Sequence, residues 1–140
     1  MKLFSLALAI ALNVGGCATS QVNAANRTIV IGIDSFSGAA DALNAARQAE
    51  EDQLEAKVKS GAMTPDQATV EYMAWMAKGQ KAARALITFF DSLKAASHVV
   101  AAVAAGQSGD MASAMGDVFA ALQDAASALA DVGVHIKGIN

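Results

Sequence analysis

Apolar residues recur along much of this chain with the period of an α-helix. Between residues 65 and 106 they fall alternately three and four positions apart without a charged interruption, which is the spacing of a coiled-coil seam. The seam positions are Tyr72, Trp75, Gly79, Ala82, Leu86, Phe89, Leu93, Ala96, Val100 and Val103. Thr64, Pro65 and Gln67 have the order of an N-cap, a first helical residue and a capping box. We therefore predict one long helix that ends at Gly106 and measures about 60 Å.

Further apolar residues widen the stripe in the first half of this helix, so that this half could face two neighbours. These residues are Met73, Met76, Ala83, Ile87 and Phe90.

A seven-residue repeat between residues 109 and 132 predicts a second amphipathic helix, which Gly133 would end. Its seam also alternates spacings of four and three, through Met111, Met115, Val118, Leu122, Ala125, Leu129 and Val132. Each repeat places an aspartate beside the seam; these are Asp110, Asp117, Asp124 and Asp131. We expect these carboxylates to form a solvated helix face, with a surface for a basic partner as the alternative.

The segment before residue 61 is harder to interpret. Ser37 is a candidate N-cap for a helix that ends at Ser60, with an apolar stripe diluted by alanine. The run from Thr28 to Ile33 is apolar and β-branched, which is typical of a short strand, and its counterpart lies at residues 134–139. Residues 18–27 are polar and have neither period, so they predict a tether that reaches about 30 Å when extended.

The fold class predicted from these patterns is all-α. Short connections at residues 61–63 and 106–109 make consecutive helices antiparallel, which gives an elongated hairpin bundle of three helices with one long central helix. The first helix would cover the first half of the central helix, and the third would cover the second half. Ser37 and Gly133 would then lie near its middle, where the two candidate strands could form a short β pairing.

Composition supports a folded but thin core. The 140 residues are 54% hydrophobic and 16% charged, which is unlike a disordered chain. Alanine supplies 34 residues and the aromatic residues only seven, so apolar area per residue is small and close helix packing is favoured. The net charge of −3 offers no basic patch for phosphates, which argues against nucleic-acid binding.

The N-terminus carries a secretory signal. Lys2 precedes the apolar run Leu3 to Leu12, which is too short to span a bilayer core of about 30 Å. The next residues, Val14-Gly15-Gly16-Cys17, resemble the lipobox of bacterial lipoproteins, some of which bacteriophages encode. This resemblance implies that residues 1–16 are a signal peptide and that Cys17 is lipidated. It further implies that residues 17–27 are a tether, that 28–140 form a single helical domain, and that Ala18 directs the protein to the outer membrane.

An ordinary signal peptide remains the alternative, with cleavage near Ala18 or Ala24 and loss of Cys17. Under either interpretation the mature chain holds no internal disulfide, because Cys17 is its only cysteine.

The sequence predicts no catalytic, cofactor-binding or metal-binding residues. Asp34 and Gly38 superficially have the setting of a phosphate loop, but the Lys-Ser/Thr that ends such loops is missing, so Asp34 is expected in a turn or at a helix start. Neighbouring aspartates of the repeat lie about 10.5 Å apart and cannot share one Ca²⁺. His98 and His135 lack a second ligand at metal spacing and are expected at the surface or at helix ends.

The function expected from these observations is that of an outer-membrane-anchored periplasmic lipoprotein. It would act as a structural or interaction module through its helices, contacting the membrane by the lipid on Cys17 and a protein partner or a second copy by its seams, with no evident small-molecule substrate. The alternative is a phage-type exclusion or lysis lipoprotein that inserts a helical hairpin into the membrane. Asp91, Lys94 and His98 argue against insertion of residues 85–105, because charged groups are costly in the bilayer. A hydrolase built around Asp34 is a third, remote class.

Overall fold

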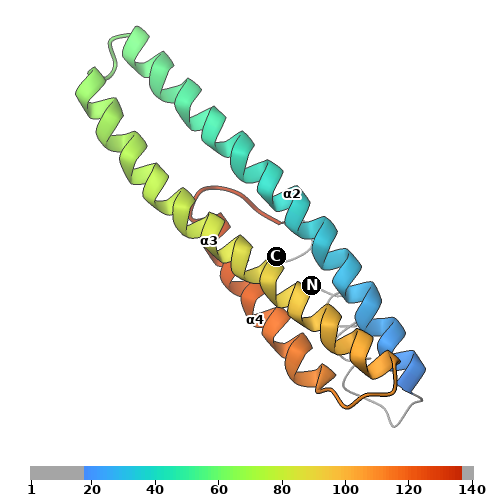
Figure 1. The fold of residues 1–140 in the computed structure, drawn as a ribbon. Coiled ribbons are helices and arrows are strands. Elements are labelled where there is room, and N and C mark those ends of the chain that lie inside the picture. Colours follow the sequence, from blue (N-terminus) through green and yellow to red (C-terminus); the bar gives the residue numbers. More distant parts are fainter. Residues whose placement is uncertain (1–17, 137–140) are drawn as a thin grey trace.

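The computed structural model of the chain describes residues 18–136, which form three α-helices (Figure 1). They are α2 (Ala18–Lys59), α3 (Pro65–Ala104) and α4 (Met111–Ala130). Within residues 18–136 no strand is present, so the predicted all-α class is confirmed. Cys17 and the predicted signal peptide lie outside the described residues, as do the last four residues.

Helix α2 is nearly twice as long as the helix predicted from Ser37. Residues 18–27, predicted to be a tether, are helical, and so are residues 28–33, predicted to be a strand; both predictions are wrong. The reason is a seam of residues at alternating spacings of four and three that faces α3. It was missed because several of its positions are alanine or glycine, which do not stand out as an apolar stripe. The residues of this seam are Ala25, Ile29, Gly32, Phe36 and Ala39.

Burial along this seam outweighs the β propensity of the Thr-Ile-Val-Ile run. The hydroxyl groups of Thr28 and Ser35 donate to carbonyl oxygens one turn earlier, those of Ala24 and Ile31, at 3.1 and 2.8 Å. Both are thereby satisfied within the helix.

Gly32 marks the closest approach of α2 to α3. A β-carbon added at this position would lie 2.5 Å from a methyl carbon of Leu93. The missing side chain therefore lets the Leu93 side chain pack directly against the α2 backbone, and any larger residue would displace it.

Helix α3 agrees closely with the sequence analysis. The Thr64 hydroxyl accepts from the Gln67 amide at 3.3 Å, the Gln67 side chain accepts from the Thr64 amide at 3.0 Å, and Pro65 is the first helical residue. The helix continues through Gly79 and Asp91 to Ala104, and Gly106 follows it at φ 76°. The central seven seam residues are all buried, namely Gly79, Ala82, Leu86, Phe89, Leu93, Ala96 and Val100.

Helix α4 also has the predicted face. The Asp110 carboxylate caps its first turn by accepting from the Ser113 amide at 2.9 Å, and Gly133, at φ 77°, follows its end. Six of the seven predicted seam residues are buried, and Ala121 and Ala128 are buried with them; the six are Met115, Val118, Leu122, Ala125, Leu129 and Val132.

The helices form an elongated, antiparallel arrangement with α3 in the centre (Figure 1). Helix α2 packs along the whole of α3, not only along its first half as predicted. Helix α4 covers the second half of α3 as predicted, and an exposed ion pair of 3.4 Å joins Lys81 of α3 to Asp131 at the C-terminal end of α4. The far end of the molecule is thus a hairpin of two helices only, joined at residues 60–64 and called the tip below.

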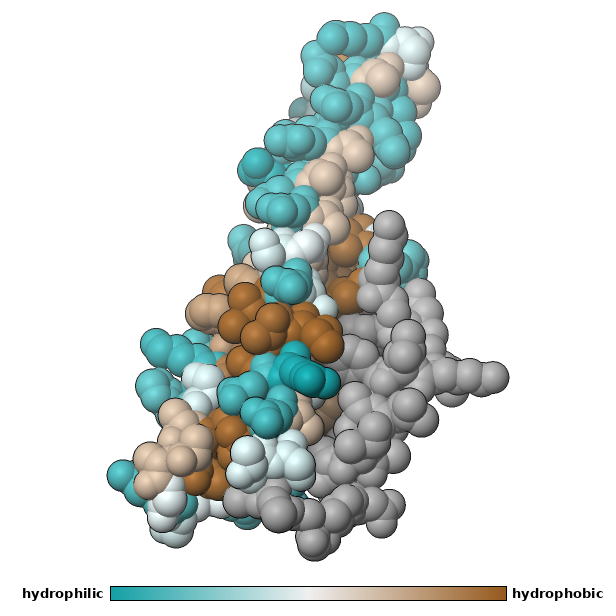
Figure 2. Space-filling model, turned by 90° about the vertical axis from the view of Figure 1, so that its right-hand side faces the viewer, coloured by the Kyte–Doolittle hydropathy of each residue, from teal (hydrophilic) through white to brown (hydrophobic). Residues whose placement is uncertain are grey.

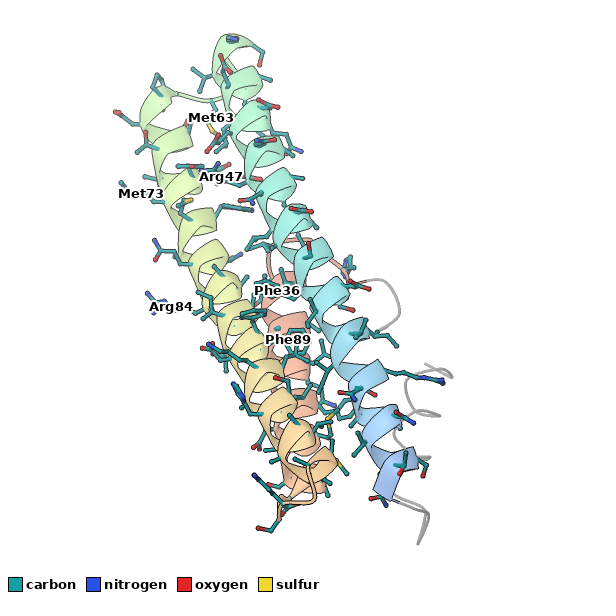
Figure 3. All side chains as sticks on the ribbon, turned by 45° about the vertical axis from the view of Figure 1, so that its right-hand side comes forward. Phe36, Arg47, Met63, Met73, Arg84 and Phe89 are labelled. Atoms are coloured by element: carbon teal, nitrogen blue, oxygen red, sulfur yellow. The ribbon has the colours of Figure 1, made fainter. Side chains whose placement is uncertain are left out.

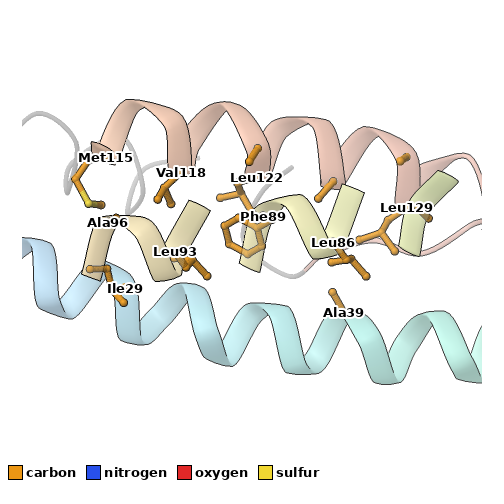
Figure 4. Packing of buried hydrophobic residues seen from close by; sticks show 14 of the residues in the cluster. Ile29, Ala39, Leu86, Phe89, Leu93, Ala96, Met115, Val118, Leu122 and Leu129 are labelled. Carbon is orange, nitrogen blue, oxygen red and sulfur yellow. The ribbon is translucent and has the colours of Figure 1, made fainter. Parts of the chain in front are cut away.

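The core lies where α3 passes between α2 and α4. Figure 4 shows Leu86, Phe89 and Leu93 between the two outer helices, with Ile29 and Ala39 on one side and Leu122 and Leu129 on the other. Phe89, Leu93 and Leu129 are among the largest side chains that are fully buried. Residues 134–136 cross from α4 towards α2 as an irregular segment, and residues 28–33 are helical, so the expected short β pairing is not formed by the described residues.

Candidate functional site

Three regions of residues 18–136 have the geometry or the exposure of a possible functional site. They are the hollow beside Asp34, the groove at the tip, and an exposed apolar face of α2 and α3.

The first region brings together residues that the sequence analysis singled out separately. A hollow of about 450 Å³ lies between α2 and the segment after α4, and Asp34, Ser35 and His135 contribute to its lining. Carboxylate, hydroxyl and imidazole groups in one hollow are the components of a nucleophilic site.

Their arrangement, however, is not that of such a site. The Ser35 hydroxyl donates to the Ile31 carbonyl oxygen at 2.8 Å, so its proton is directed into the helix backbone. Asp34 and His135 are exposed, and the hollow beside them is mainly apolar. Asp34 itself lies in the middle of α2, not in the turn or at the helix start where it was expected. The hollow therefore has the residue types of a hydrolase without its hydrogen bonds.

The aspartates of the repeat have separate structural roles. Asp110 is the N-cap of α4, Asp131 pairs with Lys81, and Asp117 and Asp124 are exposed. His98 is exposed on α3. Among residues 18–136 no group of three or more histidine, cysteine, aspartate or glutamate side chains is placed to hold a metal ion.

The second region, the groove at the tip, was not anticipated. It has a volume of about 430 Å³ and lies between the last turns of α2 and the first turns of α3, with Leu54, Val58 and Ala68 among its apolar lining residues. Glu51 and Glu55 stand at its rim. The sequence contained one indication of this groove. The apolar residues Leu54 and Val58 stand within or one turn beyond the acidic run at residues 50–55.

Hydrogen bonds hold the rim of this groove. The Tyr72 hydroxyl donates to the Glu51 carboxylate, which raises the pKa of Tyr72 above its ordinary value. A hydrogen bond and ion pair with Lys59 lower the pKa of Glu55. Lys57 and Glu71 join the two helices at 3.4 Å. The charges of Glu55 and Glu71 are thus partly neutralised by lysines, whereas Glu51 keeps its charge and accepts the hydrogen bond of a neutral hydroxyl.

The third region is an exposed apolar face on the α2–α3 pair, called the apolar face below. It comprises Val30, Ile33, Ile87 and Phe90, and the Phe90 ring packs on the Phe36 ring with centroids 4.9 Å apart. The exposed fractions are 58% for Ile87, 44% for Ile33 and 39% for Phe90. Figure 2 shows hydrophobic side chains gathered in the lower half of the molecule, whereas the tip is mostly hydrophilic.

Helix α4 does not cover this face. In Figure 3 it lies behind α2 and α3, and in Figure 4 it packs on the side of α3 that carries Phe89 and Ala96. The seams of α3 and α4 are satisfied inside the chain, so they are not free for a partner. The apolar residues that remain available are those beside the seam.

Helix α3 has a further property that bears on function. Within residues 18–136 it is the one helix long and apolar enough to cross a membrane, judged by length and composition alone. In this structure the same helix supplies the core between α2 and α4, although only 28% of its most apolar 18-residue window is buried.

Comparisons with known proteins assign none of these regions. The chain matches no protein-family model, no curated protein and no solved structure.

Proposed function

We propose that the chain is an outer-membrane-anchored periplasmic lipoprotein that acts as a structural or interaction module, by surface contact and not by catalysis. The observation that supports it best is the position of α2 relative to Cys17. The described part of this helix runs from Ala18, the residue after this cysteine, through 42 residues to the tip. A lipid on Cys17 would therefore hold one end of a rod about 60 Å long.

An anchor of this kind gives the rod a defined direction. The end that contains the α3–α4 connection would lie near the membrane, and the tip would project into the periplasm. Multiple acyl chains would make the attachment durable, because each buried methylene contributes about 0.8 kcal/mol. Partners would meet the charged tip first and the apolar face closer to the membrane.

The test is metabolic labelling with a palmitate analogue. The native chain should carry the label, and Cys17→Ala should lose it and accumulate as unprocessed or soluble protein. Ser20→Ala, three residues beyond the cysteine, is the matched control and should keep the label. Undiminished label on Cys17→Ala would refute the anchor.

A membrane-active hairpin remains the second candidate, because of the length and apolar composition of α3. Insertion would have to expose the buried seam to lipid and to bury Asp91, Lys94 and the aspartates of α4, each at a cost of about 2.5 kcal/mol or more. We therefore expect the non-lipidated chain from Ala18 to be soluble and to release no dye from liposomes. Dose-dependent release that Val100→Asp abolishes would favour the second candidate.

A further inference from the structure

We draw no further inference here: the strongest candidate, the groove at the tip between the last turns of α2 and the first turns of α3, has a rim whose carboxylates already bond to Lys59 and Tyr72, so nothing in the structure shows what would occupy it.

Discussion

The same substitution at two valines of α3 should lower stability at one position and not at the other. Val100 is 2% exposed and lies in the seam, whereas Val70 is 68% exposed near the tip. Replacing either by alanine removes two methyl groups and places a better helix former in the helix, which favours folding by about 0.5 kcal/mol. Any difference in the free energy of unfolding between the two variants therefore comes from the burial of those methyl groups.

The magnitude follows from the structure. At Val100 the loss of two buried methyl groups costs about 1.6 kcal/mol in transfer free energy, and the cavity that remains adds to it. After subtraction of the helix propensity, the free energy of unfolding should fall by about 1.5 to 2.5 kcal/mol. At Val70 nothing buried is lost, so the free energy of unfolding should stay the same or rise by up to about 0.5 kcal/mol.

Urea unfolding followed by circular dichroism at micromolar concentration measures both values on the chain from Ala18. In a thermal melt Val100→Ala should lower the Tm by roughly 5 to 10 °C. Equal losses at the two positions, or a larger loss at Val70, would show that the buried side of α3 is assigned wrongly.

Three further outcomes are expected. Leu86→Asp and Leu122→Asp should unfold or severely loosen the chain in thermal melts, because each buries an unpaired charge, while Asp117→Asn should be nearly silent; a larger loss from the Asp117 change would contradict the core. Tyr72 is the only tyrosine, so absorbance at 295 nm reports its ionisation, which should occur at higher pH than in Glu51→Ala. This hydrogen bond is present below the ordinary pKa of tyrosine and is lost as pH rises through the raised value, so identical midpoints would contradict it. Thr64→Ala should cost about 1 kcal/mol by removing the cap of α3, and no change in urea unfolding would mean that the cap is dispensable.

The sequence was sufficient for α3 and α4 because local and long-range signals agree there. Thr64, Pro65 and Gln67 define the start of α3, and its seam then continues without a charge to Val103. Capping hydrogen bonds and burial both act on the same residues, so the predicted and observed faces coincide.

The first half of α2 could not be predicted in this way. Ile29 and Gly32 face α3, but they stand within a β-branched run whose local preference is for a strand. Their burial depends on Leu93, more than fifty residues away, and a contact of that kind leaves no mark on the local pattern. The hollow lined by Asp34 and His135 could not be predicted for the same reason, because these two residues are also far apart in the sequence.

The apolar face could be predicted only in part from the sequence. The stripe through Met73 and Ile87 indicated a second neighbour for α3, but which side α4 would cover depends on packing. The structure resolves this point: α4 lies against Phe89 and Ala96, and Ile87 and Phe90 stay exposed.

Intact-mass spectrometry of the mature protein, extracted from the outer-membrane fraction, tests the central proposal most directly. The account predicts a chain that starts at Cys17 and carries the added mass of acyl chains on that residue. An unmodified chain that starts at Ala18 or near Ala24, recovered from the soluble periplasm, would contradict it.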